Sequence, residues 1–219
     1  MNNNCAKLGA ADRIKIFFNG RAFYVFDQVY RPDADTFLLA ENLEVNPEDS
    51  VLELGTGCGL LSILSALKAE HVVAVDINPY AVRCTKLNAK TNGVPDRVDV
   101  IRGDLCSSLR QDAFFDLILF NAPYLPVTEQ EIRSWIDYAW SGGLKGRKII
   151  DRFITQTSDH LKPGGRVLLV QSTLSDVKQT LKEFQQRGFK ATVIGEQKAE
   201  FETITLIQAE LNDPYRRQS

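Results

Sequence analysis

Four consecutive residues, Asn121-Ala122-Pro123-Tyr124, follow a mostly apolar run at 115–120 that predicts a buried strand. Ligands of open α/β sheets bind just beyond the carboxyl ends of parallel strands, so a polar amide and an aromatic ring at this point could act on a substrate. Pro123 favours an extended conformation for the residue before it, so the chain cannot run directly into a helix. Asn and Pro are also common in turns, and the four residues alone fit a strand-exit turn equally well.

A second candidate group is Glu53-x-Gly55-x-Gly57-x-Gly59, between a predicted strand at 51–54 and a predicted helix that begins at Leu60. Glycines allow a ligand to approach the backbone closely, and the start of the helix offers free N–H groups. The dinucleotide fingerprint has the different spacing G-x-G-x-x-G, and a carboxylate beside a pyrophosphate is unfavourable. This counts against a nicotinamide-dependent oxidoreductase, whereas a ligand with an amino group and a sulfonium would tolerate Glu53. The alternative is a turn with a structural role only.

Two further carboxylates follow the next two predicted strands, where they would face the same edge of the sheet. Asp76 ends the strand 72–76, and a carboxylate there can accept hydrogen bonds from both ribose hydroxyls of an adenosyl group. Asp104 follows the strand 97–101 and could accept a hydrogen bond from the amino group of an adenine, with Leu105 packed on the adenine ring. Each acid alone also fits a helix cap or a turn. Together with the glycine-rich group they predict a site for an adenosyl group.

These groups require a sheet whose strand ends meet. Predicted strands and helices alternate from 51 to 187, which favours a parallel sheet covered by helices. Two consecutive strands, at 189–195 and 202–209, then follow, so the last one is expected to run antiparallel. We therefore predict an α/β, Rossmann-like fold with a seven-stranded, mostly parallel sheet, an antiparallel last strand and helices on both faces.

Two more elements precede the core, and one long segment interrupts it. Runs of β-prone residues on both sides of Asn19-Gly20 predict a β-hairpin at 14–26, and a capped helix is expected at 33–43. The segment 125–146, here called the lid, is long and carries several aromatic residues, namely Trp135, Tyr138 and Trp140. Its length and composition favour a functional loop over a tight connection.

The composition is that of a globular protein and shows no feature of a nucleic-acid or membrane binder. The chain has 219 residues, of which 44% are hydrophobic and 25% charged, with a net charge of −2 and a pI near 5.8. Dedicated nucleic-acid binders carry a basic domain or stripe, so nucleic acid is not expected as a partner. No apolar run approaches the ~20 residues of a membrane span, and the first residues lack the features of a secretory signal.

The cysteines and histidines argue against a disulfide framework and a metal centre. The cysteines form no C-x-x-C pair, which predicts reduced thiols in a cytoplasmic protein; they are Cys5, Cys58, Cys84 and Cys106. His71 and His160 have no acidic or thiol partner at ligand spacing. We therefore expect no metal in this chain and no Ser/His triad.

The glycine-rich group resembles the first motif of class I S-adenosylmethionine-dependent methyltransferases. Residues 121–124 resemble the Asn-Pro-Pro-Tyr motif of those members that methylate planar amino nitrogens, which implies a catalytic role for Asn121, Ala122, Pro123 and Tyr124. The side-chain oxygen of Asn121 and the carbonyl oxygen of residue 122 would each accept one N–H of the substrate, while Tyr124 would pack on its planar group. Ala122 stands where the family usually has proline, so the acceptor is kept and the rigid φ is lost.

Nearly the whole chain is similar to the HemK family, in its short archaeal and eukaryotic branch of release-factor glutamine N5-methyltransferases. The similarity rests on VYRPDADTFLL at 29–39 and AWSGGLKGRKIIDRF at 139–153 as well as on the two motifs. In that branch an Asp-Thr pair before the first helix reaches the cofactor, which points to Thr36; Arg31 departs from the branch, which commonly has Glu there. The residues expected to bind S-adenosylmethionine are Thr36, Glu53, Gly55, Gly57, Gly59, Asp76, Asp104, Leu105 and Asn121. Those expected to bind the substrate are Asn121, Tyr124 and Trp140.

This branch implies a substrate and a partner. The substrate would be the glutamine of the Gly-Gly-Gln loop in a class I release factor. Bacterial members carry a separate N-terminal helical domain, for which too few residues precede the first core strand here. The short branch needs a small zinc-binding activator subunit that adds a strand to the sheet. The strand near Val98 and Ile101 would be the exposed edge that receives it. The alternative is a solvated edge, because Arg97, Asp99 and Arg102 alternate with its apolar residues.

Other functions stay open at the level of the sequence. A methyltransferase for an exocyclic amino group of RNA or DNA is the main alternative, supported by a basic cluster near the lid at Lys145, Arg147, Lys148 and Arg152. A non-catalytic module that keeps the cofactor fold is another, in view of Ala122 and Arg31. We expect an N-terminal extension packed on the core, a methyltransferase domain and a tail, at 1–45, 46–211 and 212–219.

Overall fold

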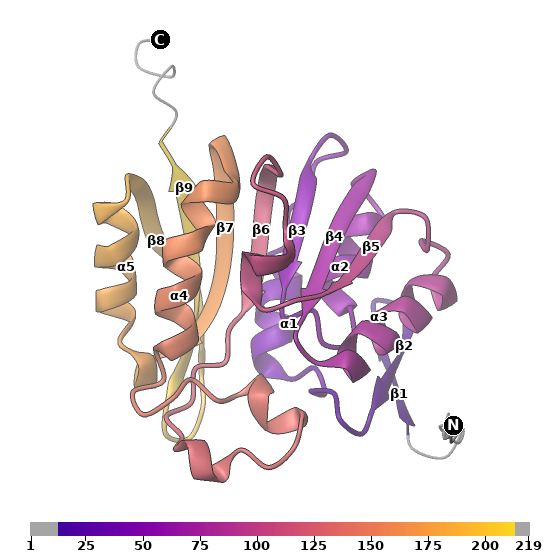
Figure 1. Cartoon of the computed structure of the whole chain (residues 1–219), viewed down its shortest axis with the longest axis horizontal. Coiled ribbons are helices and arrows are strands. Elements are labelled where there is room, and N and C mark those ends of the chain that lie inside the picture. Colours follow the sequence, from indigo (N-terminus) through magenta and orange to yellow (C-terminus); the bar gives the residue numbers. More distant parts are fainter. Residues whose placement is uncertain (1–12, 213–219) are drawn as a thin grey trace, which may run out of the picture.

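A seven-stranded sheet forms the centre of the structure, a computed structural model that describes residues 13–212. Its strands are β3 (Ser50–Leu54), β4 (His71–Asp76), β5 (Val98–Arg102), β6 (Phe115–Asn121), β7 (Leu161–Ser172), β8 (Phe189–Lys198) and β9 (Thr203–Leu211). They lie in the order β5-β4-β3-β6-β7-β9-β8 (Figure 1). β9 is antiparallel to β7 and β8, whereas the other neighbouring pairs are parallel. This confirms the predicted mostly parallel sheet with an antiparallel last strand.

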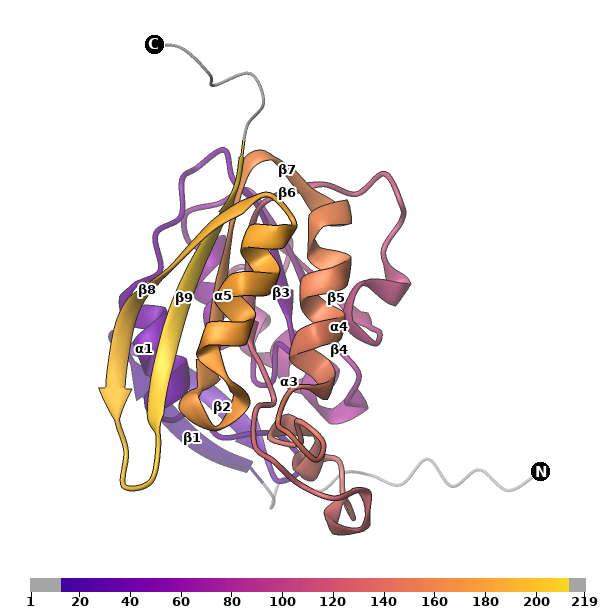
Figure 2. The same cartoon turned by 90° about the vertical axis from the view of Figure 1, so that its left-hand side faces the viewer.

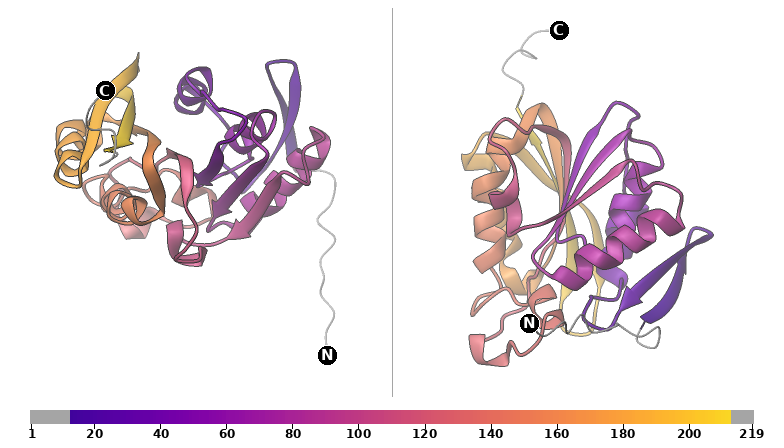
Figure 3. Two further views of the ribbon diagram at one scale, coloured as in Figure 1. Left: turned by 90° about the horizontal axis from the view of Figure 1, so that it is seen from above. Right: turned by 45° about the vertical axis from the view of Figure 1, so that its right-hand side comes forward.

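Helices cover both faces of the sheet, as predicted. The first three, α1 (Ala34–Glu41), α2 (Leu60–Ala66) and α3 (Pro79–Thr91), lie on one face (Figure 3, left). The other two, α4 (Lys148–Thr157) and α5 (Val177–Gln186), lie on the opposite face and contact each other along their lengths (Figure 2). Each core strand is therefore followed by a turn at the same edge of the sheet, where the candidate residues at the strand ends meet.

The N-terminal hairpin consists of β1 (Arg13–Phe18) and β2 (Arg21–Phe26), which pair antiparallel. Its turn, Asn19-Gly20, has φ values of 46° and 74°, the positive range that two-residue hairpin turns require. The side-chain amide of Asn88 on α3 donates to the backbone oxygen of Tyr24 and accepts from its backbone nitrogen, each at 2.7 Å. Asn88 thus replaces a neighbouring strand for β2 and holds the hairpin on α3.

Some expectations differ from the structure or fall outside it. The composition of Lys162-Pro163-Gly164-Gly165 favours a turn before a strand, but β7 already starts at Leu161. Phe115 pairs with Leu161 and Leu117 pairs with Arg166, so 162–165 bulge out of the strand. The first 12 residues of the expected N-terminal extension and most of the expected tail, 213–219, lie outside the described residues. Within residues 13–212 no helix combines the length and the apolar composition that crossing a membrane requires.

Candidate active site

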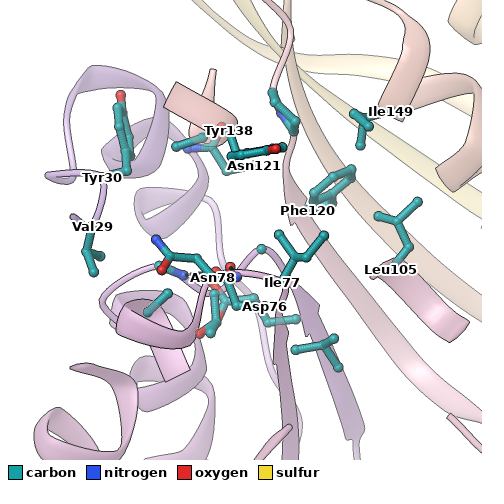
Figure 4. Close-up of a pocket in the computed structure, with 18 of the residues that line it drawn as sticks. Val29, Tyr30, Asp76, Ile77, Asn78, Leu105, Phe120, Asn121, Tyr138 and Ile149 are labelled. Atoms are coloured by element: carbon teal, nitrogen blue, oxygen red, sulfur yellow. Dashed lines mark hydrogen bonds between the residues drawn. The ribbon is translucent and has the colours of Figure 1, made fainter. Parts of the chain in front are cut away.

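A cavity of about 330 Å³ lies at the carboxyl ends of β3, β4, β5 and β6. In Figure 4, Tyr30 lies on one side of it and Leu105 on the other, with Asp76 and Asn121 between them. Most residues selected from the sequence line it, namely Thr36, Glu53, Gly55, Gly57, Asp76, Asp104, Leu105, Asn121 and Pro123. Four others do not line it, namely Gly59, Ala122, Tyr124 and Trp140. The structure therefore brings the strand-end residues together and places part of the predicted catalytic group elsewhere.

Backbone hydrogen bonds hold the glycine-rich turn after β3 against the end of β4. The Thr56 N–H donates to the Val75 oxygen at 3.1 Å. The Gly57 N–H donates to Asp76 Oδ2 at 2.8 Å, and the Asn78 N–H donates to Asp76 Oδ1 at 2.9 Å. Each oxygen of Asp76 therefore keeps one acceptor position for a ligand. Burial raises the pKa of Asp76, and the two N–H donors oppose this shift.

Gly57 and Gly59 serve different purposes in this turn, although both have positive φ, at 58° and 83°. A Cβ atom added to Gly57 would meet nothing within 4 Å, so the backbone there borders open space. A Cβ atom on Gly59 would come within 2.7 Å of Thr85 Cγ2 on α3. Gly59 thus allows the start of α2 to pack closely on α3, and its contact with a cofactor stays a prediction.

Glu53 is a buried carboxyl group at the floor of the cavity. Its Oε2 atom accepts from the Thr56 hydroxyl at 2.8 Å and from the Ser62 N–H at 2.9 Å, and it also accepts from the Ser62 hydroxyl. Burial raises the pKa of Glu53 to about 8, and the hydrogen bonds from Ser62 and Thr56 only partly oppose this. A positive charge nearby would favour the ionised form, so the position suits a cationic ligand.

Asp104 and Leu105 line the cavity, and Leu105 lies on the opposite side from Tyr30 (Figure 4). Arg152 reaches across from α4 and donates to Asp104 Oδ2 at 2.8 Å, which leaves Oδ1 for another donor. Leu105 has a φ of 51°, in the left-handed region that a leucine rarely adopts, and it lines the cavity. Strained residues of this kind gather at ligand sites, where the surrounding structure enforces them. Arg152 was not selected from the sequence as a site residue.

Asn121, the last residue of β6, presents an unsatisfied acceptor at the cavity. Its Nδ2 atom donates to the Thr36 hydroxyl oxygen at 3.1 Å. Its Oδ1 atom is buried and has no hydrogen-bond partner in the described part of the chain. Leaving a buried acceptor unpaired costs about 1–3 kcal/mol, so the atom favours a ligand that brings an N–H or O–H donor. Ala122 beside it is buried, and its N–H donates to the Val170 oxygen at 3.2 Å.

Asp35 was not among the residues selected from the sequence, yet it connects several of them. Its Oδ1 atom accepts from the Thr36 N–H at 2.5 Å and the Thr36 hydroxyl at 3.1 Å. Its Oδ2 atom accepts from the Tyr30 hydroxyl at 3.0 Å and the Tyr124 hydroxyl at 3.4 Å. Burial, and then the charge of Asp35, raise the pKa of both phenols. Tyr124 therefore points its hydroxyl at Asp35, and its predicted packing on a substrate stays a prediction.

The base of the lid is closed by backbone contacts that explain its glycines. The Leu125 N–H donates to the Trp140 oxygen, and the Gly142 N–H donates to the Leu125 oxygen, both at 2.9 Å. A Cβ atom on Gly142 would come within 2.6 Å of the Gly146 backbone, and one on Gly146 within 2.2 Å of the Tyr124 oxygen. The glycines of this segment are therefore needed for close packing of the lid on the strand exit.

The lid contributes aromatic residues to the cavity, but not the predicted one. Trp135 and Tyr138 line it, and they come from or directly precede the short 3₁₀ helix Ile136–Ala139. Their rings lie 5.6 Å apart between centroids, and the Arg102 guanidinium lies 5.7 Å from the Trp135 ring. Trp140 uses its backbone to close the lid base and does not line the cavity. The sequence showed that the lid is aromatic, but not which of its rings turns inward.

The basic cluster near the lid is largely neutralised by carboxylates. Arg147 is 5% exposed and pairs with Asp151 at 2.7 Å. Lys148 pairs with Glu129 at 3.2 Å, and Arg152 makes the ion pair with the acid that follows β5. A cluster already paired in this way offers little charge for phosphate contacts, which weakens the nucleic-acid alternative.

β5 is the edge strand of the sheet and pairs with β4 on one side. The Arg97 oxygen accepts from the Val72 N–H at 2.8 Å, and the Gly103 N–H donates to the Asp76 oxygen at 3.0 Å. Bonds to one parallel neighbour come from alternate residues, so the odd-numbered positions of β5 face β4. The N–H and C=O of Val100, at the centre of β5, therefore point outward.

Among residues 13–212, no three His, Cys, Asp or Glu side chains are grouped to hold a metal ion.

Comparisons with known proteins agree with this geometry. The sequence model of the methyltransferase small domain family matches residues 24–136. A Methanocaldococcus jannaschii protein, named as a candidate protein N5-glutamine methyltransferase, is 43% identical over 184 residues, which are 83% of this chain and 91% of that protein. The methyltransferase HEMK2 of Homo sapiens is 33% identical over 195 residues, which are 84% of this chain and 90% of that protein.

Among solved structures, one similar chain belongs to the Mtq2–Trm112 complex of E. cuniculi, which is responsible for the methylation of the eRF1 translation termination factor. The similarity covers 84% of the present chain and 99% of the matched chain, with 27% identity and a TM-score of 0.61.

Proposed function

The chain belongs to the HemK family of protein glutamine methyltransferases, and we propose that it transfers a methyl group from S-adenosylmethionine to the side-chain amide nitrogen of a protein glutamine. The proposed substrate is the Gly-Gly-Gln loop of a class I peptide chain release factor, which the eRF1-methylating complex supports. The observation that carries the proposal is the buried, unpaired Oδ1 atom of Asn121, a residue that lines the cavity. A cytoplasmic location, where translation terminates, is part of the proposal.

The residues around the cavity fit the proposed cofactor. S-adenosylmethionine supplies an electrophilic methyl group when bound and leaves as S-adenosylhomocysteine. Asp76 keeps one acceptor position on each oxygen, as two ribose hydroxyls require. Asp104 keeps Oδ1 for an adenine amino group beside Leu105, while Glu53 suits the cationic part. The cavity of about 330 Å³ is also in the range of small-molecule sites.

Asn121 would act on the glutamine by holding its nitrogen. An amide nitrogen is a poor nucleophile because its lone pair is delocalised into the carbonyl group. Oδ1 of Asn121 would accept one of its N–H groups, and we propose the carbonyl oxygen of Ala122 as the second acceptor. Two fixed acceptors orient the nitrogen and stabilise the positive charge that develops on it. Asn121 is the better supported of the two, because the residue lines the cavity and its buried Oδ1 atom has no hydrogen-bond partner among residues 13–212.

The test is a methyl-transfer assay with labelled S-adenosylmethionine, a recombinant release factor and, in parallel, bulk RNA. We expect label in the factor, none in a factor whose Gly-Gly-Gln glutamine is replaced by alanine, and labelling at least about 100-fold slower with the Asn121→Ala enzyme. Label in RNA and none in the factor would contradict the proposal and favour methylation of an exocyclic amine. Cofactor binding without any transfer would indicate a non-catalytic module.

We also propose that a small zinc-binding subunit adds a strand to β5. The support is the outward-facing backbone of Val100 and the similarity to a chain that was solved as part of a two-protein complex. Val100→Pro removes the outward N–H without removing a bond to β4, so it should abolish co-purification with the subunit. Val100→Thr keeps the N–H and serves as the matched control. Equal co-purification of the two variants would count against this edge.

A further inference from the structure

We infer that Asp35 and Thr36 are positioning residues that fix which way the Asn121 amide points, so that its oxygen faces the substrate. The inference rests on the proposed function and deepens it, because it names the residues that give Asn121 its preference for an N–H donor. Neither residue touches the reacting nitrogen in this account. Both act through Asn121.

The first step is that the Asp35 carboxylate has no acceptor position left. A carboxylate has about four lone-pair sites, two on each oxygen. Oδ1 receives the N–H and the hydroxyl of Thr36, and Oδ2 receives the hydroxyls of Tyr30 and Tyr124. Asp35 is 5% exposed and lies in the first turn of α1, where the free N–H groups of the helix favour a negative charge. Four donors around one buried carboxylate fix it as an acceptor only.

The second step fixes the direction of the bond between Thr36 and Asn121. The Thr36 hydroxyl has one proton, and it donates that proton to Asp35 at 3.1 Å. The hydroxyl oxygen can then only accept from Asn121, at 3.1 Å, so the atom of Asn121 that faces it must be the NH₂ nitrogen. The Asn121 oxygen is thereby directed to the other side, where it is buried and has no hydrogen-bond partner among residues 13–212.

The third step is why this direction matters. The oxygen and the NH₂ group of an asparagine have nearly the same size, so packing alone hardly distinguishes the two orientations. If the NH₂ group of Asn121 were turned towards the substrate, it would place a donor opposite the two N–H donors of the glutamine nitrogen. Tyr124 closes the arrangement, since the first and the last residue of the 121–124 motif both bond to the Asp35-Thr36 pair. Asp35 and Thr36 therefore fix the Asn121 side chain in the one orientation that presents its oxygen as an acceptor.

The test compares Thr36→Val, which keeps the shape and removes the hydroxyl, with Thr36→Ser, which keeps the hydroxyl. For Thr36→Val we expect kcat on the release factor to fall roughly 10- to 100-fold, the effect of losing one well-placed hydrogen bond, with the Kd for S-adenosylmethionine within about 3-fold. Thr36→Ser should restore most of the rate. A parallel rise of the Kd for the cofactor would instead assign Thr36 to cofactor binding and overturn the inference.

A substrate analogue gives a readout that a purely structural role would not change. A release factor with glutamate in place of the Gly-Gly-Gln glutamine presents acceptors only, so it should be a poor competitor of the wild-type enzyme. In Thr36→Val, where NH₂ can turn inward, its inhibition constant should fall about 10-fold relative to wild type and to Thr36→Ser. An unchanged ratio would overturn the inference.

A spectroscopic measurement keeps the inference testable without turnover. In ¹⁵N-labelled protein, one Asn121 side-chain N–H should exchange slowly because it donates to Thr36. Its protection should be lost in Thr36→Val and kept in Thr36→Ser. Absence of methyl transfer by the wild-type enzyme would contradict the proposed function, whereas an unprotected Asn121 amide in an otherwise folded wild-type protein would contradict the inference alone.

Discussion

Two groups of polar residues line the cavity, a cofactor half around Asp76 and an acceptor half around Asn121, and they are held in different ways. In the cofactor half, Asp76 is fixed by the backbone N–H groups of Gly57 and Asn78. In the acceptor half, Asn121 is fixed by side chains only, through the hydroxyl of Thr36. Backbone donors remain when neighbouring side chains are substituted. In a series of hydrogen-bonded side chains, by contrast, each side chain orients the one that follows it, so a single substitution affects the rest. We therefore expect substitutions in the cofactor half to weaken binding, and substitutions in the acceptor half to slow the transfer step.

The largest effect is expected for Asn121→Ala in the acceptor half. The change removes the buried, unpaired Oδ1 acceptor of Asn121, and loss of a comparable preorganised group lowers kcat by about 10²–10³. The Kd for S-adenosylmethionine should stay within about 3-fold of wild type, because Asp76 and its backbone donors are untouched. Single-turnover assays and calorimetry measure the two quantities. A kcat close to wild type would break the division between the two halves.

Asp76→Asn is the corresponding change in the cofactor half. Both carboxylate oxygens accept a backbone N–H, so an amide must turn its NH₂ group towards one of these donors. Losing a charge-assisted acceptor and creating this donor–donor contact should raise the Kd for S-adenosylmethionine about 10- to 100-fold. At saturating cofactor kcat should be within about 3-fold of wild type. If Asp76→Asn lowered kcat by as large a factor as it raised the Kd, the two halves of the cavity would not be independent.

The cofactor half was also the part that the sequence predicted best, for a physical reason. Its acids lie in, at or just after the ends of predicted strands, and a parallel sheet brings the carboxyl ends of its strands to one edge. Glu53, Asp76 and Asp104 line the cavity because their place in the chain fixes their place in space. The order of elements was predictable for the same reason, since apolar runs and glycine-rich turns alternate through the core.

The acceptor half depends on contacts between distant segments, which a single sequence does not specify. Asp35 reaches Tyr124 across 89 positions of the chain. Trp135 lines the cavity while Trp140 closes the lid base, and the backbone bonds of Leu125 decide between them. Composition could show that these segments are polar and aromatic. It could not show which side chain turns inward or which carboxylate joins the two ends of the motif.

The pH dependence of stability tests the cofactor half alone, through the buried carboxyl group of Glu53. Burial raises the pKa of Glu53 from 4.5 to about 8, so between these values the folded protein holds a proton that the unfolded chain has released. The contribution of the Glu53 proton to the free energy of unfolding is therefore fully present below pH 4.5, and it is lost as the pH rises through about 8. Without cofactor, the free energy of unfolding should fall by up to about 1.4 kcal/mol per pH unit between pH 6 and 8.

Glu53→Gln should remove this slope, because the amide keeps an oxygen for Ser62 and Thr56 and never ionises. Urea titrations at pH 6, 7 and 8 measure the effect in both proteins. Asn121→Ala in the acceptor half serves as the control and should keep the slope of the wild type. A slope that survives in Glu53→Gln would have to come from another group.

The smallest effect is expected for Tyr124→Phe, which keeps the ring and removes the hydroxyl. The lost bond to Asp35 Oδ2 is long, at 3.4 Å, and the Tyr30 hydroxyl at 3.0 Å still occupies the same oxygen. A weak hydrogen bond contributes little, so kcat should fall by only about 2- to 3-fold, with an unchanged Kd for the cofactor. The matched variant Tyr30→Phe removes the shorter bond and should cost more. If Tyr124→Phe lowered kcat as strongly as Asn121→Ala, the phenol would have to act on the substrate directly, because its contribution through Asp35 is too small to explain such a loss.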